Sequence, residues 1–114
     1  MEMVEQASFY FRSPAAYDPQ AIAKFWGPEA PARYAALIKR IEAQEAFDTE
    51  SLEALYRGLA AEMGLKLVDL AQLTRIALTG KTASPPIFQV AAILGKPETI
   101  ERLRSAHKAA SAAR

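Results

Sequence analysis

The sequence predicts an all-α domain of about six short helices, because apolar residues recur at helical spacing along most of the chain. Proline and glycine divide these stretches at short intervals, and no alternation typical of a β-strand continues for more than a few residues. Short connections of this kind favour sharp changes of direction over a bundle of long parallel helices.

The first two helices are opened by prolines. Asp18 followed by Pro19 is an N-cap with proline at the first helical position, and it predicts a helix to about residue 26 that ends at Gly27. Residues 28–44 are expected to form the next helix. Its buried face follows helical spacing and consists of Tyr34, Leu37, Ile38 and Ile41.

The next two helices end at glycines. Asp48 is expected to cap the third helix, and Gly64 is its left-handed terminator. The apolar stripe of this helix consists of Leu52, Leu55, Tyr56, Leu59 and Met63. Asp69 is expected to cap a shorter helix that runs to residue 78 and ends at Gly80.

The last two helices follow a short basic loop. Residues 85–94 are expected to form a helix that Ser84 and Pro85 open and Gly95 closes. The final helix starts near Pro97 and decays into a frayed tail over residues 107–114.

The composition excludes several classes of protein. A chain of 114 residues suffices for one domain with a modest core, but not for a large enzyme pocket. The absence of cysteine excludes disulfides, thiolate zinc sites and a cysteine nucleophile, and it fits a reducing cytosol. No stretch approaches the roughly 20 apolar residues of a membrane helix, and the acidic start does not resemble a signal peptide. We therefore expect a cytoplasmic protein without a membrane partner.

The charges are unevenly distributed along the chain. Residues 1–63 hold six Lys/Arg and ten Asp/Glu, whereas residues 64–114 hold eight Lys/Arg and three Asp/Glu. Such a split suggests a polyanionic partner for the C-terminal half. The alternative is that alanine-rich helices need charges for solubility and that the signs separated by chance.

The sequence holds no constellation typical of an enzyme active site or a metal site. The single histidine, His107, has no cysteine or histidine partner and is typical of a solvated residue. Most carboxylates stand at expected helix starts, where capping explains them. Gly80-Lys81-Thr82 lacks the upstream glycine and the strand of a phosphate-binding loop. We expect that this chain alone is not an enzyme and binds neither metal nor cofactor.

Aromatic residues gather near the start of the chain, at Phe9-Tyr10-Phe11, Tyr17 and Phe25-Trp26. Such aromatics are typical of core or interdomain packing. Three successive aromatics cannot all face inward, so we expect at least one of residues 9–11 to pack against something outside this chain.

The basic loop and its flanks have two interpretations of equal weight. In the first, Phe88 belongs to the inward face of a helix with Ala91 and with Ile93 or Leu94. In the second, Ile87 or Phe88 is an apolar platform for an unstacked base, while Arg75 donates to a base or phosphate and Lys81 contacts a phosphate. Loops of RNA are recognised in this way, through splayed bases, stacking and contacts to base edges.

The block Gln72-Leu73-Thr74-Arg75-Ile76-Ala77-Leu78-Thr79-Gly80-Lys81-Thr82-Ala83-Ser84-Pro85-Pro86-Ile87-Phe88, followed by Leu94-Gly95-Lys96, resembles the C-terminal anticodon-binding domain of bacterial glutamyl-tRNA synthetases. That family shows a run like Q-P-L-R-x-A-L-T-G-x-x-x-S/T-P-G/P-L-F. Leu73 and Thr74 depart from it, since the family has proline and leucine at these two positions, and Ile87 replaces a leucine.

The resemblance implies an RNA-binding role with named residues. Arg75 would contact the first anticodon base with help from the backbone near Ile87, and further contacts would come from Gln72 and Arg57. The residues implied around the middle base are Ser84, Pro85 and Phe88.

The resemblance also implies domain boundaries and a separate catalytic domain in the parent chain. Residues 12–106 would be the anticodon-binding domain, residues 1–11 the end of a preceding subdomain or an added start, and residues 107–114 a tail. The chain lacks HIGH-like and KMSKS-like motifs, so ATP, magnesium and glutamate would be bound by a catalytic domain of the parent chain. The implied partners are a glutamate-accepting tRNA and that catalytic domain, and we expect a monomer. The rival hypothesis is a helical protein-interaction or regulatory domain with a basic face.

Overall fold

The computed structural model describes residues 17–81 and 86–112. These residues form six α-helices and no strand, which confirms the predicted all-α fold. The helices are α2 (Pro19–Phe25), α3 (Ala30–Ala43), α4 (Thr49–Met63), α5 (Leu67–Thr79), α6 (Ile87–Leu94) and α7 (Lys96–Ala112). None of the helices in the described part of the chain is long and apolar enough to cross a membrane.

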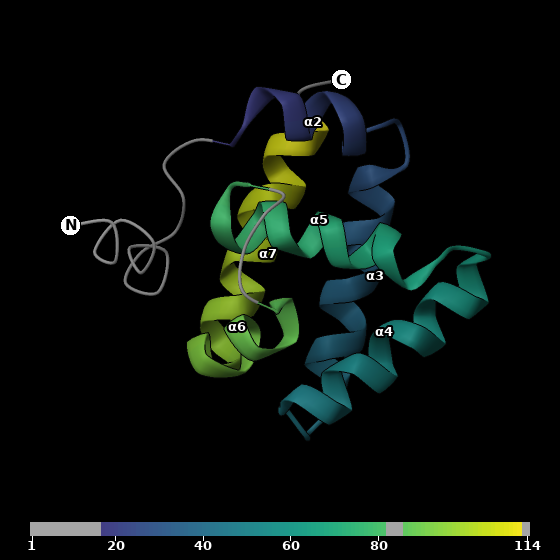
Figure 1. The fold of residues 1–114 in the computed structure, drawn as a ribbon, viewed down its shortest axis with the longest axis vertical. Coiled ribbons are helices and arrows are strands. Elements are labelled where there is room, and N and C mark those ends of the chain that lie inside the picture. Colours follow the sequence, from purple (N-terminus) through teal and green to yellow (C-terminus); the bar gives the residue numbers. More distant parts are fainter. Residues whose placement is uncertain (1–16, 82–85, 113–114) are drawn as a thin grey trace.

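The helices are arranged around α5 (Figure 1). α3 and α7 run side by side in opposite directions, and α5 crosses in front of them. α2 lies across one end of this pair, while α4 and α6 lie toward the other end. α5 contacts each of the other five helices, and seven of its 13 residues are buried. Burial of this apolar surface is the main force that stabilises the fold.

Local chemistry fixes several helix ends where the sequence predicts them. The Asp18 carboxylate accepts from the Gln20 N–H at the start of α2, at 3.0 Å. Asp48 and Ser51 form a reciprocal capping box at the start of α4, and these hydrogen bonds from Ser51 lower the pKa of Asp48. Gly64 and Gly80 end α4 and α5 with φ of 69° and 81°, a conformation that strongly favours glycine.

Other helix ends differ from the prediction. α5 begins at Leu67, and the Asp69 carboxylate accepts from the Lys66 N–H at 2.9 Å from within the first turn instead of capping from outside. α3 begins at Ala30, two residues after the expected Pro28. α7 continues through Ala112 where a tail was expected after residue 106, because its buried face extends to Ala110.

The buried faces follow the predicted spacing with two corrections. Ile38, predicted on the buried face of α3, is only partly buried, although it packs against the core. Tyr34, Leu37 and Ile41 are buried on α3, and four of the five predicted residues are buried on α4. On α4 the exception is Met63, which is 37% exposed, because it is the last residue of the helix and stands in a run, residues 61–64, that is exposed throughout.

An aromatic cluster ties α2 and α3 to α5. The Trp26 Nε1–H donates to the Tyr34 hydroxyl at 2.9 Å, and this hydroxyl donates to the Leu73 carbonyl at 2.7 Å. The Tyr17 ring lies 5.0 Å from that of Trp26, and Phe25 packs against the same core. The packing role predicted for Tyr17, Phe25 and Trp26 is therefore confirmed, whereas Phe9-Tyr10-Phe11 lies outside the described residues.

Replacing Tyr34 by phenylalanine tests the connection from α2 to α5. The Tyr34→Phe variant leaves a buried Leu73 carbonyl and the Trp26 indole N–H without their shared partner, so we expect the free energy of unfolding to fall by about 1–2 kcal/mol. Urea unfolding measures this change. Tyr17→Phe is the matched control, because its ring is only half-buried, and it should cost less than about 0.5 kcal/mol. Equal effects of the two substitutions would contradict the assignment.

Buried tyrosines predict a loss of stability at alkaline pH. Burial raises the pKa of Tyr34 and of Tyr56 above the ordinary value of 10.0, so both stay protonated in the folded state when the unfolded chain ionises. Their contribution is complete below about pH 10 and declines above it, by about 1.4 kcal/mol per pH unit for each tyrosine. Urea unfolding at about pH 8 and about pH 11 measures the decline. Tyr34→Phe should reduce the slope by the share of one tyrosine, and an unchanged slope in that variant would refute this origin.

Candidate nucleic-acid interface

The structure brings the two flanks of residues 82–85 together, because α5 and α6 contact each other. Arg75 lies in the second half of α5, Lys81 follows its end, and Ile87 and Phe88 open α6. We call these four residues the α5–α6 corner. The predicted contacts Ser84 and Pro85 lie outside the described residues, so the corner consists of their flanks.

The two apolar residues of the corner have different environments. The Ile87 side chain is 2% exposed and belongs to the core, so only the main chain of this residue is available to a ligand. Phe88 is partly buried, with its ring 5.0 Å from the Tyr56 ring in an edge-to-face arrangement. Phe88 therefore packs inward on Tyr56, as in the first interpretation, and keeps part of its surface exposed.

A polar contact links the ring beneath Phe88 to α5. The Tyr56 hydroxyl lies 2.6 Å from Thr74 Oγ1, and the Thr74 hydroxyl donates to the Leu70 carbonyl at 3.1 Å. The Tyr56 hydroxyl is therefore the donor in the first contact. Thr74 and Leu73 are both 1% exposed, so the two departures from the family pattern next to Arg75 are core residues.

The end of α5 is held by hydrogen bonds of its own Thr79 hydroxyl and by one hydrogen bond from Asp18. The Thr79 hydroxyl donates to the Arg75 carbonyl at 2.7 Å and accepts from the Lys81 N–H at 3.2 Å. The Asp18 N–H donates to the Gly80 carbonyl at 2.8 Å, which ties the start of α2 to the same turn. Lys81 is exposed and Arg75 is partly buried on the preceding turn. Both cations thus stand on a backbone that is fixed by its neighbours.

Gln72 faces α2 rather than α6. It lines a hollow of about 290 Å³ with Asp18, Gln20, Ala21, Lys24 and Phe25. Its Oε1 atom is buried and has no hydrogen-bond donor among the described residues. An unpaired buried acceptor beside an open hollow suits a ligand that carries a donor, such as a base edge.

Arg57 lies on α4, the helix that supplies the Tyr56 ring beneath Phe88. It follows Tyr56 on α4, where its exposed guanidinium pairs with Glu53 one turn earlier at 2.8 Å. The contact between α5 and α6 brings together the two helices that carry or flank the α5–α6 corner. Gln72 instead lines the hollow beside α2, and Arg57 pairs with Glu53 on α4.

Several of the cationic side chains in the C-terminal half pair with groups of the protein itself. The Lys96 ammonium donates to the Gln44 carbonyl at 2.6 Å, and Arg104 pairs with Glu42 on α3. Arg102 is buried, with its Nε donating to Glu98 at 2.7 Å. The charge split of the sequence therefore overstates the positive charge that faces solvent.

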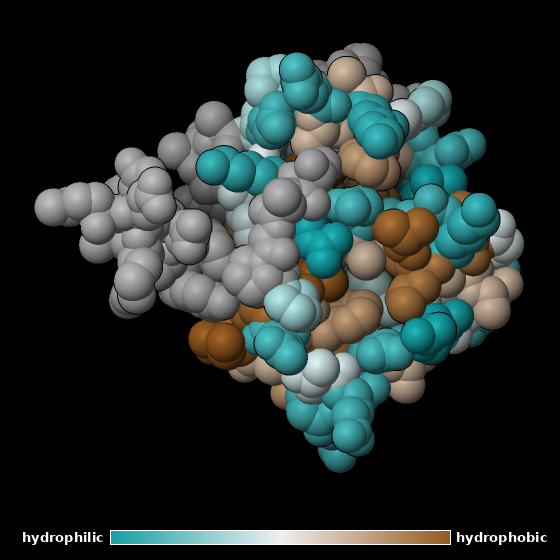
Figure 2. Space-filling model, viewed as in Figure 1, coloured by the Kyte–Doolittle hydropathy of each residue, from teal (hydrophilic) through white to brown (hydrophobic). Residues whose placement is uncertain are grey.

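The surface around the corner is mixed. In Figure 2, hydrophobic patches gather over α6 and over the start of α5, separated by hydrophilic residues. The large exposed apolar residues in the described part are Met63, Val68 and Ile93, of which Ile93 on α6 is 68% exposed. Of the two inward alternatives predicted on α6, Leu94 is the one that packs on the core.

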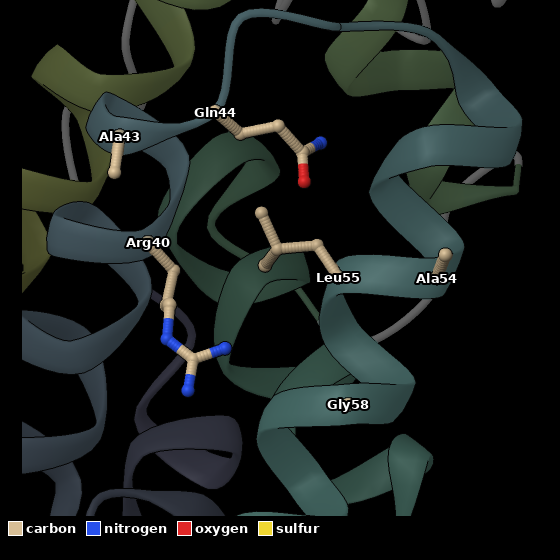
Figure 3. A pocket seen from close by; sticks show the side chains of 6 residues that line it. All are labelled: Arg40, Ala43, Gln44, Ala54, Leu55 and Gly58. Carbon is tan, nitrogen blue, oxygen red and sulfur yellow. The ribbon is translucent and has the colours of Figure 1, made fainter.

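A second hollow, of about 340 Å³, lies between α3 and α4 (Figure 3). The side chains of Arg40, Gln44 and Leu55 reach into the space between the two helix backbones. Arg40 pairs there with Glu62, and the Gln44 amide donates to the Ala46 carbonyl at 3.0 Å. Within residues 17–81 and 86–112, no group of three His, Asp or Glu side chains is placed to hold a metal ion.

Comparison with known proteins identifies the family of this chain. The family model described as an anticodon binding domain matches residues 1–107. The chain is 42% identical over 106 residues to a glutamate–tRNA ligase of Geotalea uraniireducens and 44% identical over 107 residues to glutamate–tRNA ligase 2 of Rhodospirillum rubrum, and each match covers 93% of this chain and 23% of the relative. The chain thus spans about a quarter of the length of these relatives.

A solved structure shares the fold. The crystal structure of a glutamate tRNA ligase from Elizabethkingia meningosepticum in complex with its amino acid matches with a TM-score of 0.88 and 26% identity, over 94% of this chain and 21% of that chain. The helices that carry the α5–α6 corner thus form part of an architecture also found in a tRNA ligase. This chain belongs to the anticodon-binding domain family of the glutamate–tRNA ligases.

Proposed function

We propose that this chain binds the anticodon loop of a glutamate-accepting tRNA and positions it for a catalytic domain of the parent ligase. The observation that supports this most is the α5–α6 corner in a chain of the anticodon-binding family: two cations lie toward the C-terminal end of α5 and just beyond it, and a partly exposed aromatic lies in the first turn of α6. Unpaired bases are bound by such groups through stacking and through hydrogen bonds to their edges.

The residues of the corner have distinct proposed roles. Phe88 offers an apolar surface to a splayed base, and Ser84 and Pro85, which precede it in the sequence, contribute further contacts. Arg75 donates to a base or a phosphate, the main chain at Ile87 contacts a base edge, and Lys81 contacts a phosphate. Gln72 and Arg57 are proposed as outlying contacts, Gln72 through its unpaired Oε1.

The remaining parts of the reaction belong to other regions in this proposal. ATP, magnesium and glutamate are bound by the catalytic domain of the parent ligase, and this chain supplies differential binding of the correct tRNA. The proposed setting is the cytoplasm, where translation takes place.

Two substitutions at the corner test the proposal. Phe88→Leu keeps apolar packing on Tyr56 but removes the aromatic face, and Arg75→Ala removes a donor. We expect each to weaken binding of a glutamate anticodon stem-loop about tenfold, the effect of one lost base contact. Chemical-shift titration of the labelled chain gives both the affinity and the residues affected.

Arg104→Ala is the control, because Arg104 pairs with Glu42 on α3 rather than standing at the corner. It removes one positive charge and should change the affinity by less than about twofold. If the corner variants bind as the unmodified chain does, while shifts spread over all basic residues, then the anticodon proposal fails and a helical docking domain becomes the better explanation.

The slope of the binding affinity against salt concentration measures how many phosphates the protein contacts. The logarithm of the affinity for a single-stranded loop falls by about 0.7 per contacted phosphate for each decade of salt. Lys81→Met should reduce this slope by about one such unit. Lys39→Met, an exposed lysine on α3, is the matched control and should leave the slope unchanged. Equal slopes for the Lys81 variant and the unmodified chain would remove Lys81 from the interface.

A further inference from the structure

Arg102 is the one arginine among the described residues that is fully buried, at 1% exposure. A cation removed from water in this way is costly unless hydrogen bonds and opposite charge compensate for the lost solvation. The atoms that contact its guanidinium therefore indicate what the residue does. Sequence periodicity assigns no role to this arginine.

The guanidinium bridges α7 to the last turn of α5. Its Nε donates to the Glu98 carboxylate at 2.7 Å, and its Nη1 donates to the Leu78 carbonyl at 2.9 Å. Nη2 is buried and finds no acceptor among the described residues. A planar group held at two fixed points has a defined orientation, which a flexible ammonium would not have.

The Leu78 carbonyl is one of the acceptors that a helix leaves unpaired at its C-terminus. It also lies at the negative end of the helix dipole, where a cation is stabilised. Two residues later, the Gly80 carbonyl accepts from the Asp18 N–H. The turn over residues 78–80 is therefore held by α7 on one side and by the start of α2 on the other.

From this contact we propose that Arg102 is a positioning residue for base recognition. Arg102 does not contact RNA in this proposal. It fixes the last turn of α5 and thereby the orientation of the Arg75 and Lys81 side chains. The inference rests on the proposed function, since it concerns how the α5–α6 corner discriminates bases.

A donor to the Leu78 carbonyl stabilises the fold whether or not RNA is bound, so a loss of stability alone does not distinguish a structural role from a positioning role. The Glu98 side chain is 41% exposed, so water can solvate its carboxylate when the arginine is removed. Arg102→Met places an apolar side chain of similar length between α7 and α5 and removes both directed contacts. A residue that only supports packing would tolerate this change without any effect on RNA.

The test compares Arg102→Met with Arg104→Met, which removes the same charge two residues away on the same helix. Each 114-residue variant is titrated with a glutamate anticodon stem-loop and with the same stem-loop changed at its middle base. The ratio of the two affinities measures base discrimination. We expect Arg102→Met to lower this ratio about tenfold and Arg104→Met to change it less than about twofold. An unchanged ratio in a folded Arg102→Met variant would overturn the inference.

A second readout needs no RNA. The amide resonances of Thr79, Gly80 and Lys81 should shift in free Arg102→Met and stay in place in Arg104→Met. If the unmodified chain fails to discriminate the two stem-loops, the proposed function fails. In that case the inference that Arg102 supports base recognition fails as well. The amide shifts still show whether Arg102 orders the turn over residues 78–80. If Arg102→Met still discriminates the two stem-loops as the unmodified chain does, the inference about Arg102 fails and the proposed function stands.

Should Arg102→Met not fold, Arg102→Lys replaces it. Lysine keeps the charge but reaches only one of the two oxygens, so base discrimination should fall between that of the unmodified chain and a complete loss. A folded Arg102→Lys variant with the discrimination and amide positions of the unmodified chain would overturn the inference.

Discussion

The burial of α5 is the constraint on which the rest of the structure depends. This helix contacts every other helix of the described fold, so its position decides where the others can pack. Its main-chain and side-chain polar groups must then be satisfied from within the protein. Tyr34 supplies a donor to the Leu73 carbonyl, Tyr56 contacts Thr74, and Arg102 serves the Leu78 carbonyl. Each of these long polar side chains comes from a different helix and fixes α5 against rotation.

This arrangement explains why the candidate interface lies where it does. A helix enclosed on most sides presents little beyond its ends, and the C-terminal end of α5 packs against α6. Arg75 and Lys81 are anchored there by the Thr79 hydroxyl and by the Asp18 N–H on Gly80. Phe88 rests on Tyr56, which in turn contacts Thr74 next to Arg75. Under the proposed function, a rigid support of this kind reduces the entropy lost when a short interface binds an unstacked base.

Features set by local chemistry could be predicted from the sequence, whereas features set by distant partners could not. Asp48, Gly64 and Gly80 act within one helical turn, and the structure places them as expected. The exposure of Met63 depends on which helix covers the end of α4, and the burial of Arg102 depends on a carbonyl 24 residues earlier. The interpretation of Phe88 had the same difficulty, because its spacing on α6 cannot reveal that only part of the ring is covered by Tyr56.

The distribution of charge bears on what kind of binding site this is. Lys96, Arg102 and Arg104 donate to groups within the fold. Three of the cations in the C-terminal half therefore already have partners inside the protein. Non-specific binding of nucleic acid relies on many exposed cations, each of which releases a counterion. A corner with an aromatic surface, a few cations and an unpaired Gln72 acceptor nearby has less of that general attraction. Under the proposed function, the affinity of this corner for RNA would rest more on stacking and on hydrogen bonds to base edges than on general attraction to phosphates.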